Sequence, residues 1–268
     1  MPAAERARLT DAQREELLAL MQGADGVELK LTVPSAHRRD VVRALEIDPL
    51  GAQVRQIVFF DTTDLTLNQH GVVVRARRIQ GEGDDSVVKL RPVVPSEIPE
   101  ELRTSPYFGI EVDAMPGGFV CSASYEGTPT KTDVKQVLAG EHPIADLFSD
   151  EQRAFYAAHA PDGVELDELS ILGPINTMRV KFSPSGFARR LVAELWLYPD
   201  GSQIIELSTK CAPAEAFETA EETAAFLTER GVDLTGKQET KTKTALDFFV
   251  REIRETAGAT TTEREDAR

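Results

Sequence analysis

The sequence of 268 residues contains two cysteines, one tryptophan and four histidines. Cys121 and Cys211 lie far apart, which excludes a disulfide framework and a paired-cysteine zinc site. The histidines lack the i, i+4 spacing of a zinc-binding helix. No apolar run reaches the length of a membrane span, and the first residues lack the basic and then apolar order of a secretory signal. These absences predict a soluble protein of the reducing cytoplasm with no membrane association.

The composition, with 41% hydrophobic and 28% charged residues, is that of a globular protein. A chain of this length can bury a full hydrophobic core. The net charge of −15 repels nucleic acid at long range, so we expect no nucleic-acid partner. A local basic cavity is still compatible with this balance, because many acidic residues fall in helices and at the end of the chain.

Strand-like segments repeatedly place two ionised residues two positions apart, with an apolar residue between them. These pairs are Glu28/Lys30, Arg75/Arg77, Lys89/Arg91, Glu111/Asp113, Arg179/Lys181 and, with wider spacing, Glu206/Lys210. In a strand, residues i and i+2 project from the same face, so each pair points one way and its apolar neighbours point the other. This pattern fits either a sheet with one face in water or a β-barrel with a charged lumen.

The barrel interpretation has chemical consequences. Burying so many unpaired ions costs several kcal/mol each, so such a lumen must hold water, metal and an anionic ligand. Arginine and lysine bind phosphate oxygens. Crowded carboxylates repel one another unless a divalent cation lies between them, and their hard oxygen ligands favour Mg²⁺ or Mn²⁺. A metal-bound polyphosphate suits this combination of charges.

The hydrophobic periodicity predicts an α+β chain. Helices are expected at 10–21, 36–47, 132–139, 144–160, 214–230 and 243–256. Strands are expected at 27–33, 54–61, 71–79, 86–93, 107–114, 169–182, 187–198 and 202–209, with a bulge or break at Gly173-Pro174. We expect a closed or nearly closed antiparallel β-barrel of about eight strands, with the helices outside. Residues 1–25 would form a helical extension, 26–256 the barrel domain with a helical insertion at 130–160, and 257–268 a disordered tail.

One block of the sequence resembles a known family. Residues 59–67, FFDTTDLTL, followed by GVVVRARR at 71–78, are similar to the "YFDTxDxxL … G … LRxR" block of CYTH-domain proteins in the triphosphate tunnel metalloenzyme superfamily. The strand that contains Glu28 and Lys30 resembles the family's opening ExExK strand. Glu111-Val112-Asp113 resembles a later acidic pair, and the resemblance covers about residues 26 to 250.

The resemblance implies phosphoryl transfer from a linear triphosphate, driven by positioning and charge neutralisation. It assigns catalytic roles to Lys30, Arg75, Arg77 and Lys89. It assigns phosphate binding to Arg91, Arg179, Lys181, Lys210 and Lys241, with Lys243 as an alternative to Lys241. It assigns one or two Mg²⁺ or Mn²⁺ ions to Glu28, Glu111, Asp113, Glu194 and Glu206. The competing interpretation of each residue is a surface ion pair, worth ~0–1 kcal/mol.

Two positions depart from the family pattern. The first acid of the ExExK strand should fall at position 26, which is Gly26, and Asp25 would reach the same face only through a bulge. An acid is also expected two residues after Glu206, where the chain has Ser208. Both departures remove metal-ligand charge.

Three functions are compatible with these residues. The first is a metal-dependent hydrolase of tripolyphosphate, a nucleoside triphosphate or thiamine triphosphate. The second is an adenylate cyclase of the class IV type, which needs a base pocket, and the third is a non-catalytic binder of polyphosphate-like anions. Trp196 is either a stacking platform for a base or thiamine ring or an ordinary buried aromatic residue. The expected partner is a small anionic triphosphate, and the expected state is a monomer or homodimer.

Overall fold

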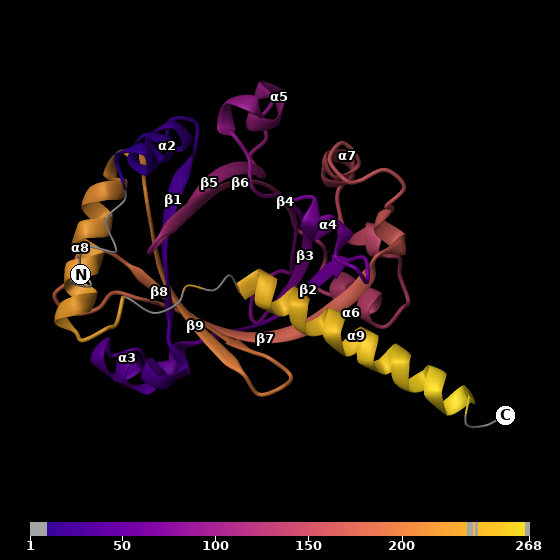
Figure 1. Cartoon of the computed structure of the whole chain (residues 1–268). Coiled ribbons are helices and arrows are strands. Elements are labelled where there is room, and N and C mark those ends of the chain that lie inside the picture. Colours follow the sequence, from indigo (N-terminus) through magenta and orange to yellow (C-terminus); the bar gives the residue numbers. More distant parts are fainter. Residues whose placement is uncertain (1–9, 235–237, 239–240, 266–268) are drawn as a thin grey trace.

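The protein is represented by a computed structural model, which describes residues 10–234, 238 and 241–265. Nine strands form a closed barrel in the order β1-β5-β6-β4-β3-β2-β7-β8-β9 (Figure 1). Strands β1 and β5 are parallel, and the other neighbours are antiparallel. The strands are β1 (Gly26–Val33), β2 (Gln53–Asp61), β3 (Val72–Ile79), β4 (Asp85–Leu90), β5 (Phe108–Met115), β6 (Gly118–Gly127), β7 (Ser170–Phe182), β8 (Leu191–Leu197) and β9 (Gln203–Cys211). The predicted barrel is confirmed, with one parallel pair in place of an all-antiparallel sheet.

Helices lie around the outside of the barrel, and α9 crosses one end of it (Figure 1). The α-helices are α2 (Asp11–Met21), α3 (Arg38–Ala44), α4 (Thr66–Gln69), α5 (Glu100–Arg103), α6 (Asp133–Leu138), α7 (Asp150–Ala157), α8 (Ala216–Glu229) and α9 (Lys241–Glu265). Short 3₁₀ turns lie at Ser35–His37, Pro49–Gly51, Pro95–Glu97, Ile144–Leu147, Leu166–Glu168 and Pro213–Glu215. None of the described helices is long and apolar enough to cross a membrane.

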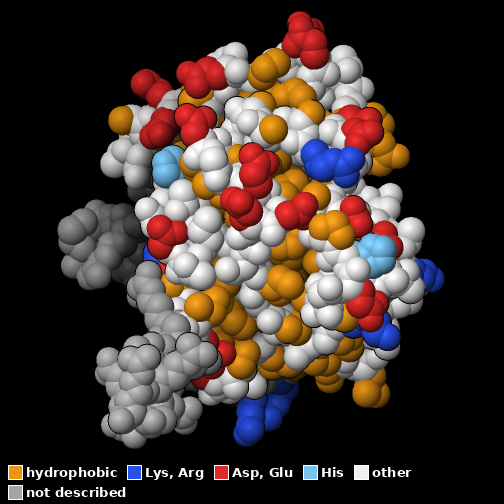
Figure 2. All heavy atoms as spheres, turned by 90° about the vertical axis from the view of Figure 1, so that its right-hand side faces the viewer, with side chains coloured by type: hydrophobic (Ala, Val, Ile, Leu, Met, Phe, Trp, Pro, Cys, Tyr) orange, Lys and Arg blue, Asp and Glu red, His pale blue; other side chains and the backbone are white. Residues whose placement is uncertain are grey.

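The apolar faces of the strands point outward and form the core with these helices. Val74 of β3 and Val88 of β4 pack in one buried cluster with Val134 of α6 and Phe155 of α7. The helical insertion therefore covers the outer face of β3 and β4, as the alternation of apolar and charged residues requires. On the face that Figure 2 shows, acidic side chains are spread over the surface and basic side chains are sparse, while many basic residues lie inside the barrel.

Two segments differ from the sequence-based prediction. Strand β6 was not expected; although it contains Phe119, Val120 and Tyr125, its small Gly, Ser and Ala residues weaken the pattern, and it is held by pairing with β4 and β5 on either side. Residues 257–265, expected to belong to the tail of the chain, continue helix α9. Residues 266–268 lie outside the described part of the chain.

Helix α9 begins against one end of the barrel. Ile57 and Phe59 of β2 and Trp196 of β8 pack with Ala245 and Leu246 of α9. This cluster makes one end of the interior apolar. The predicted irregularity at Gly173-Pro174 is confirmed as a register shift between β2 and β7, opposite Ile57 and Phe59.

Candidate functional site

The barrel interior contains a cavity of about 200 Å³. Its lining includes the exposed Lys243 of α9 and the lumen-facing ionised residues Lys30, Arg75, Arg77, Lys89, Arg91, Asp113, Glu194, Glu206 and Lys241. The strand residues alternate with outward apolar residues, so the alternation of each strand places its charges in the lumen. A larger cavity of about 750 Å³ lies outside the barrel, between α8 and strands β1 and β9. Its lining is mostly apolar, which does not suit the chemistry of charged ligands.

Three carboxylates from adjacent strands meet at one wall of the lumen. Glu28 of β1 lies opposite Asp113 of β5 in the parallel register, and Glu111 lies two residues earlier on β5. One oxygen of each group lies within 4.8 Å of the others. The Asp113 side chain is fully buried. We call Glu28, Glu111 and Asp113 the β1/β5 carboxylates; three convergent oxygen donors fit a hard divalent cation.

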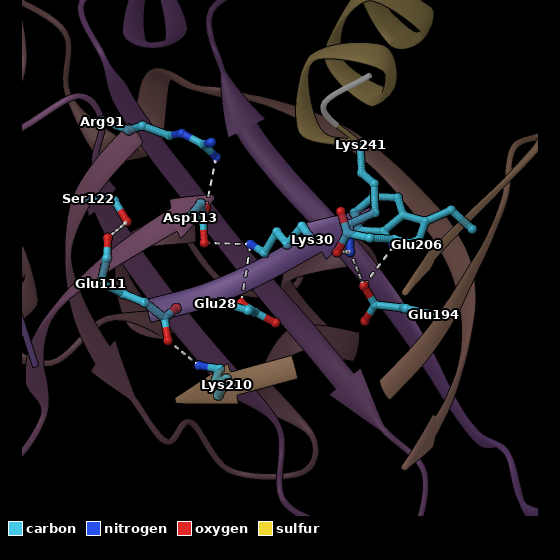
Figure 3. Close-up of polar contacts among 11 residues, drawn as sticks. Glu28, Lys30, Arg91, Glu111, Asp113, Ser122, Glu194, Glu206, Lys210 and Lys241 are labelled. Atoms are coloured by element: carbon cyan, nitrogen blue, oxygen red, sulfur yellow. Dashed lines mark hydrogen bonds and ion pairs between the residues drawn. The ribbon is translucent and has the colours of Figure 1, made fainter. Parts of the chain in front are cut away.

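Basic residues on neighbouring strands partly neutralise the β1/β5 carboxylates (Figure 3). Lys30 Nζ lies 2.7 Å from Asp113 Oδ1 and 3.2 Å from Glu28 Oε2. Arg91 Nη1 lies 3.3 Å from Asp113 Oδ2, and Lys210 forms an ion pair with Glu111 at an exposed position. Burial works against the charged forms, but these cations outweigh it and lower the pKa of both Glu28 and Asp113. Burial would lower the pKa of Lys30, but the nearby carboxylates of Asp113 and Glu28 raise it.

A second pair of carboxylates, Glu194 and Glu206, has a different counter-ion. The two residues face each other across β8 and β9, and we call them the β8/β9 carboxylates. Lys241, the first residue of α9, forms an ion pair with Glu194 and lies with its Nζ 2.7 Å from Glu206 Oε1 (Figure 3). Burial opposes ionisation of Glu194, but Lys241 and a hydrogen bond from Trp196 Nε1 hold its pKa well below the usual range.

Two lumen cations lack a carboxylate partner within the described part of the chain. Among the described residues, Arg75 forms no ion pair, and its buried Nε atom has no hydrogen-bond partner. Burial and the nearby Arg77 lower the pKa of Arg75 to about 10. Burial also lowers the pKa of Lys89 to about 8; Asp113 opposes this shift, and Lys30, Arg75 and Arg91 add to it. Buried cations of this kind are stabilised by an anionic ligand.

The sequence analysis missed Arg55. This residue of β2 is 6% exposed, and its pKa is lowered by burial and then by the positive charges of Arg77 and Arg179. Arg77 is paired with Asp85 of β4, at 2.8 Å between Nε and Oδ1. In the sequence, Arg55 alternates with Gln53 and Ile57 on one face of β2, and neither of these neighbours is charged. Arg55 therefore did not belong to any of the charged pairs that indicated the lumen.

Most of the predicted site residues come together. Of these residues, the cavity is lined by Lys30, Arg75, Arg77, Lys89, Arg91, Asp113, Glu194, Glu206 and Lys241, and Glu28 and Glu111 adjoin it through Asp113. Arg179 lies opposite Glu194 on the adjacent strand and is partly buried. Lys210 and Lys181 are exposed where β9 and β7 end, and Lys181 contacts none of the other predicted residues in the described ion pairs. The functional roles of all these residues stay predictions.

The two departures from the family pattern can be located. The Cβ of a residue at position 26 would meet only the Cys211 carbonyl oxygen, at 3.8 Å, so Gly26 leaves room for a side chain. Ser208 lies opposite Lys30, and its hydroxyl makes a small contribution to the lowered pKa of Glu28. Asp25 does not replace the missing acid, because its Oδ2 accepts a hydrogen bond from the Ile110 backbone N–H at 2.7 Å.

Comparison with known proteins identifies the fold. No protein-family model and no curated protein sequence matches the chain. Among solved structures, a proposed adenylate cyclase from Bacillus halodurans matches with a TM-score of 0.58 at 16% identity, over 82% of this chain and 97% of that one. The chain therefore shares the fold of this structure over most of its length. A proposed adenylyl cyclase from Hippeastrum, described as having a dominant triphosphatase activity, matches with a TM-score of 0.60 at 17% identity, over 81% of this chain and 93% of that one.

Proposed function

We propose that the protein is a metal-dependent hydrolase of a linear triphosphate. The observation that carries this proposal is the pair of lumen cations Arg75 and Lys89, which lack a carboxylate partner among the described residues and line the same cavity as Asp113. Cations without counter-ions at one wall and convergent carboxylates at another together suit a phosphate chain with its bound cation. The fold shared with a protein of dominant triphosphatase activity adds support.

The chain's own residues bind and orient the substrate. Arg75 and Arg77 donate to phosphate oxygens in bidentate geometry, and Lys89 adds a point charge. Lys30, held between Glu28 and Asp113, orients the terminal phosphate. The β1/β5 carboxylates would hold Mg²⁺ or Mn²⁺, which when bound neutralises phosphate charge and activates water.

The size of the cavity favours an inorganic chain over a nucleotide. Its volume of about 200 Å³ lies below the ~300–1,000 Å³ of typical sites for larger organic ligands. Trp196 offers no free stacking face for a base, because it is 3% exposed, stacks on Phe59 and lies under the Lys241 ammonium. We therefore propose tripolyphosphate as the substrate, ahead of nucleoside or thiamine triphosphates and ahead of cyclisation of ATP.

Phosphate release measured from tripolyphosphate, ATP and thiamine triphosphate, with Mg²⁺, with Mn²⁺ and with EDTA, tests this proposal. Cyclic AMP is measured in the same ATP reactions. We expect release from tripolyphosphate to be fastest and to stop with EDTA. Cyclic AMP as the main product would support the cyclase, and binding of tripolyphosphate without turnover under either metal would contradict both enzymatic functions.

A further inference from the structure

A cavity of about 750 Å³ lies outside the barrel, between helices α2 and α8 and the outer faces of β5, β1 and β9 (Figure 1). Its volume falls within the ~300–1,000 Å³ of typical binding sites for organic ligands. Outward-facing residues of the three strands form its floor. Ala114, Leu29 and Thr209 lie side by side in the strand register, and Leu31 lies opposite Leu207. We call this space the α8 cavity.

Helix α8 leaves the α8 cavity open because it carries small side chains on the face toward the floor. Ala216, Ala220 and Ala224 recur every four residues, so they share one helix face, and all three line the cavity. Thr223 also lines it, and its buried Oγ1 has no hydrogen-bond partner among the described residues. Protein interiors seldom contain large voids or unpaired buried hydroxyl groups, so both features indicate a bound ligand.

The lining of the α8 cavity favours an aliphatic ligand. Leucine and valine side chains predominate, and they come from helices and strands alike, for example Leu17 of α2, Val27 of β1 and Leu227 of α8. Two aromatic residues, Phe119 and Phe217, contribute, so a flat ring would find few stacking partners. A hydrocarbon chain suits this lining better than a polar molecule, because it gives up no hydrogen bonds with water when it enters.

One cation at the rim of the α8 cavity is held in position without a counter-ion. The Arg14 guanidinium lies over the ring of Phe217, 5.7 Å from its centroid, and it forms no ion pair with the described residues. Glu221, an exposed residue of the same lining, has no comparable contact among these residues. Lys30 contributes to the lining, but its ammonium group pairs with Asp113 in the lumen. Because arginine binds carboxylates in bidentate geometry, the rim favours an anionic head group.

We propose that the α8 cavity binds a single-chain aliphatic carboxylate, with the hydrocarbon chain between α8 and the sheet and the head group on Arg14. The head group keeps its contact with water, since Arg14 is exposed, while the chain is removed from water. The proposal is independent of the proposed function, because Arg14 and helix α8 take no part in the lumen site.

Isothermal titration calorimetry with dodecanoate, decanoate and dodecyltrimethylammonium, each below the concentration at which it forms micelles, tests the proposal. We expect dodecanoate to bind about tenfold more tightly than decanoate, the effect of two buried methylene groups, and more tightly than the cationic probe. Arg14→Gln should weaken dodecanoate binding about fivefold, as expected for an exposed ion pair. The matched control is Arg43→Gln, at an exposed position of α3 outside the cavity, which should leave the affinity unchanged.

Ala220→Leu tests the chain-binding part of the cavity by filling it. Dodecanoate affinity should fall at least about tenfold, while the melting temperature stays the same or rises, because the added side chain occupies empty space. Ala225→Leu, on the exposed side of α8, is the control and should change neither value. If Ala220→Leu fails to fold, Arg14→Gln decides the question, since Arg14 is exposed.

Several results would overturn the proposal. These are no binding of dodecanoate, tighter binding of the cationic probe, or equal losses in a variant and its control. Light scattering tests a second occupant: a wild-type dimer that Ala220→Leu converts to a monomer, without dodecanoate binding, would assign the α8 cavity to a second copy of the chain. Dodecanoate binding that appears only in Leu9→Gln would assign the cavity to residues 1–9. Each of these results would leave the proposed function intact.

Discussion

The β1/β5 and β8/β9 carboxylates face the same lumen, but their counter-ions come from different parts of the fold. Lys30, which neutralises Glu28 and Asp113, is part of the barrel wall and is shared between two acids. Lys241, which neutralises Glu194 and Glu206, comes from helix α9, outside the sheet. The first set has three carboxylates with converging oxygens, and the second is a pair already occupied by an ammonium group.

This difference indicates which carboxylates take up an exchangeable cation. The β1/β5 carboxylates converge within 4.8 Å, and one of their counter-ions is the exposed Lys210, which an incoming cation can displace from Glu111. Lys241 lies between both β8/β9 carboxylates, with 14% of its side chain exposed. Its ammonium group therefore acts as a resident cation for that pair and joins α9 to the barrel end.

The largest effect is expected from Lys241→Met, which leaves Glu194 and Glu206 buried without a counter-ion. Loss of one partner of a buried ion pair typically costs about 3–5 kcal/mol. Urea unfolding should show a free energy of unfolding lower by about this amount. Added Mn²⁺ should restore part of the loss, because a divalent cation can take the place of the ammonium.

The matched control is Lys243→Met, since Lys243 is exposed and pairs only with Asp247 on its own helix among the described ion pairs. It should cost less than about 0.5 kcal/mol. Equal stability of the Lys241 and Lys243 variants would show that the β8/β9 carboxylates do not depend on α9.

Glu111→Ala tests the role of the β1/β5 carboxylates in metal binding. The change removes one of three converging donors, and we expect metal-dependent phosphate release from tripolyphosphate to fall at least about a hundredfold. Glu101→Ala on the exposed face of α5 is the control and should leave the rate unchanged. An undiminished rate in Glu111→Ala would remove this residue from the metal site.

Gly26→Glu should strengthen the β1/β5 set. The position has room for a side chain, and it lies next to Glu111 in the parallel register. A fourth carboxylate should raise Mn²⁺ affinity about tenfold, the effect of a single good ligand. Titration calorimetry with Mn²⁺ measures the change, and a lower affinity would contradict the assignment of position 26 to the inward face.

The smallest effect is a pH dependence caused by Lys89. Its pKa of about 8 lies below the ordinary 10.5, so the unliganded lysine loses its proton as the pH rises through about 8. Tripolyphosphate affinity should then fall by at most about tenfold per pH unit above this point. Lys89→Met should bind more weakly and show no such decline. The unliganded wild-type protein should gain stability between pH 8 and 10.5, because the unfolded lysine keeps its proton longer.

Much of the barrel could be predicted because the charged pairs obey the two-residue period of a strand. Arg75/Arg77 and Glu111/Asp113 each define an inward face without reference to any other strand. Arg55 could not be found in this way, since it has no ionised partner two positions away. Strand β6 was missed because it has no pair of ionised residues two positions apart, and its pairing with β4 and β5 is a tertiary effect.

The pairing of Lys241 with the β8/β9 carboxylates also depends on tertiary structure. The sequence predicted Lys241 as a phosphate ligand and Glu194 and Glu206 as metal ligands, on resemblance alone. Their mutual contact depends on where α9 meets the barrel end, and no local pattern in the sequence specifies that position.

A crystal soaked with Mn²⁺ and tripolyphosphate tests the central claim most directly. Anomalous scattering locates the metal without reference to activity. The account predicts a Mn²⁺ peak among Glu28, Glu111 and Asp113, phosphates against Arg75 and Lys89, and Lys241 still paired with Glu194 and Glu206. A metal bound only between Glu194 and Glu206, with Lys241 displaced and phosphates absent from Arg75 and Lys89, would contradict it.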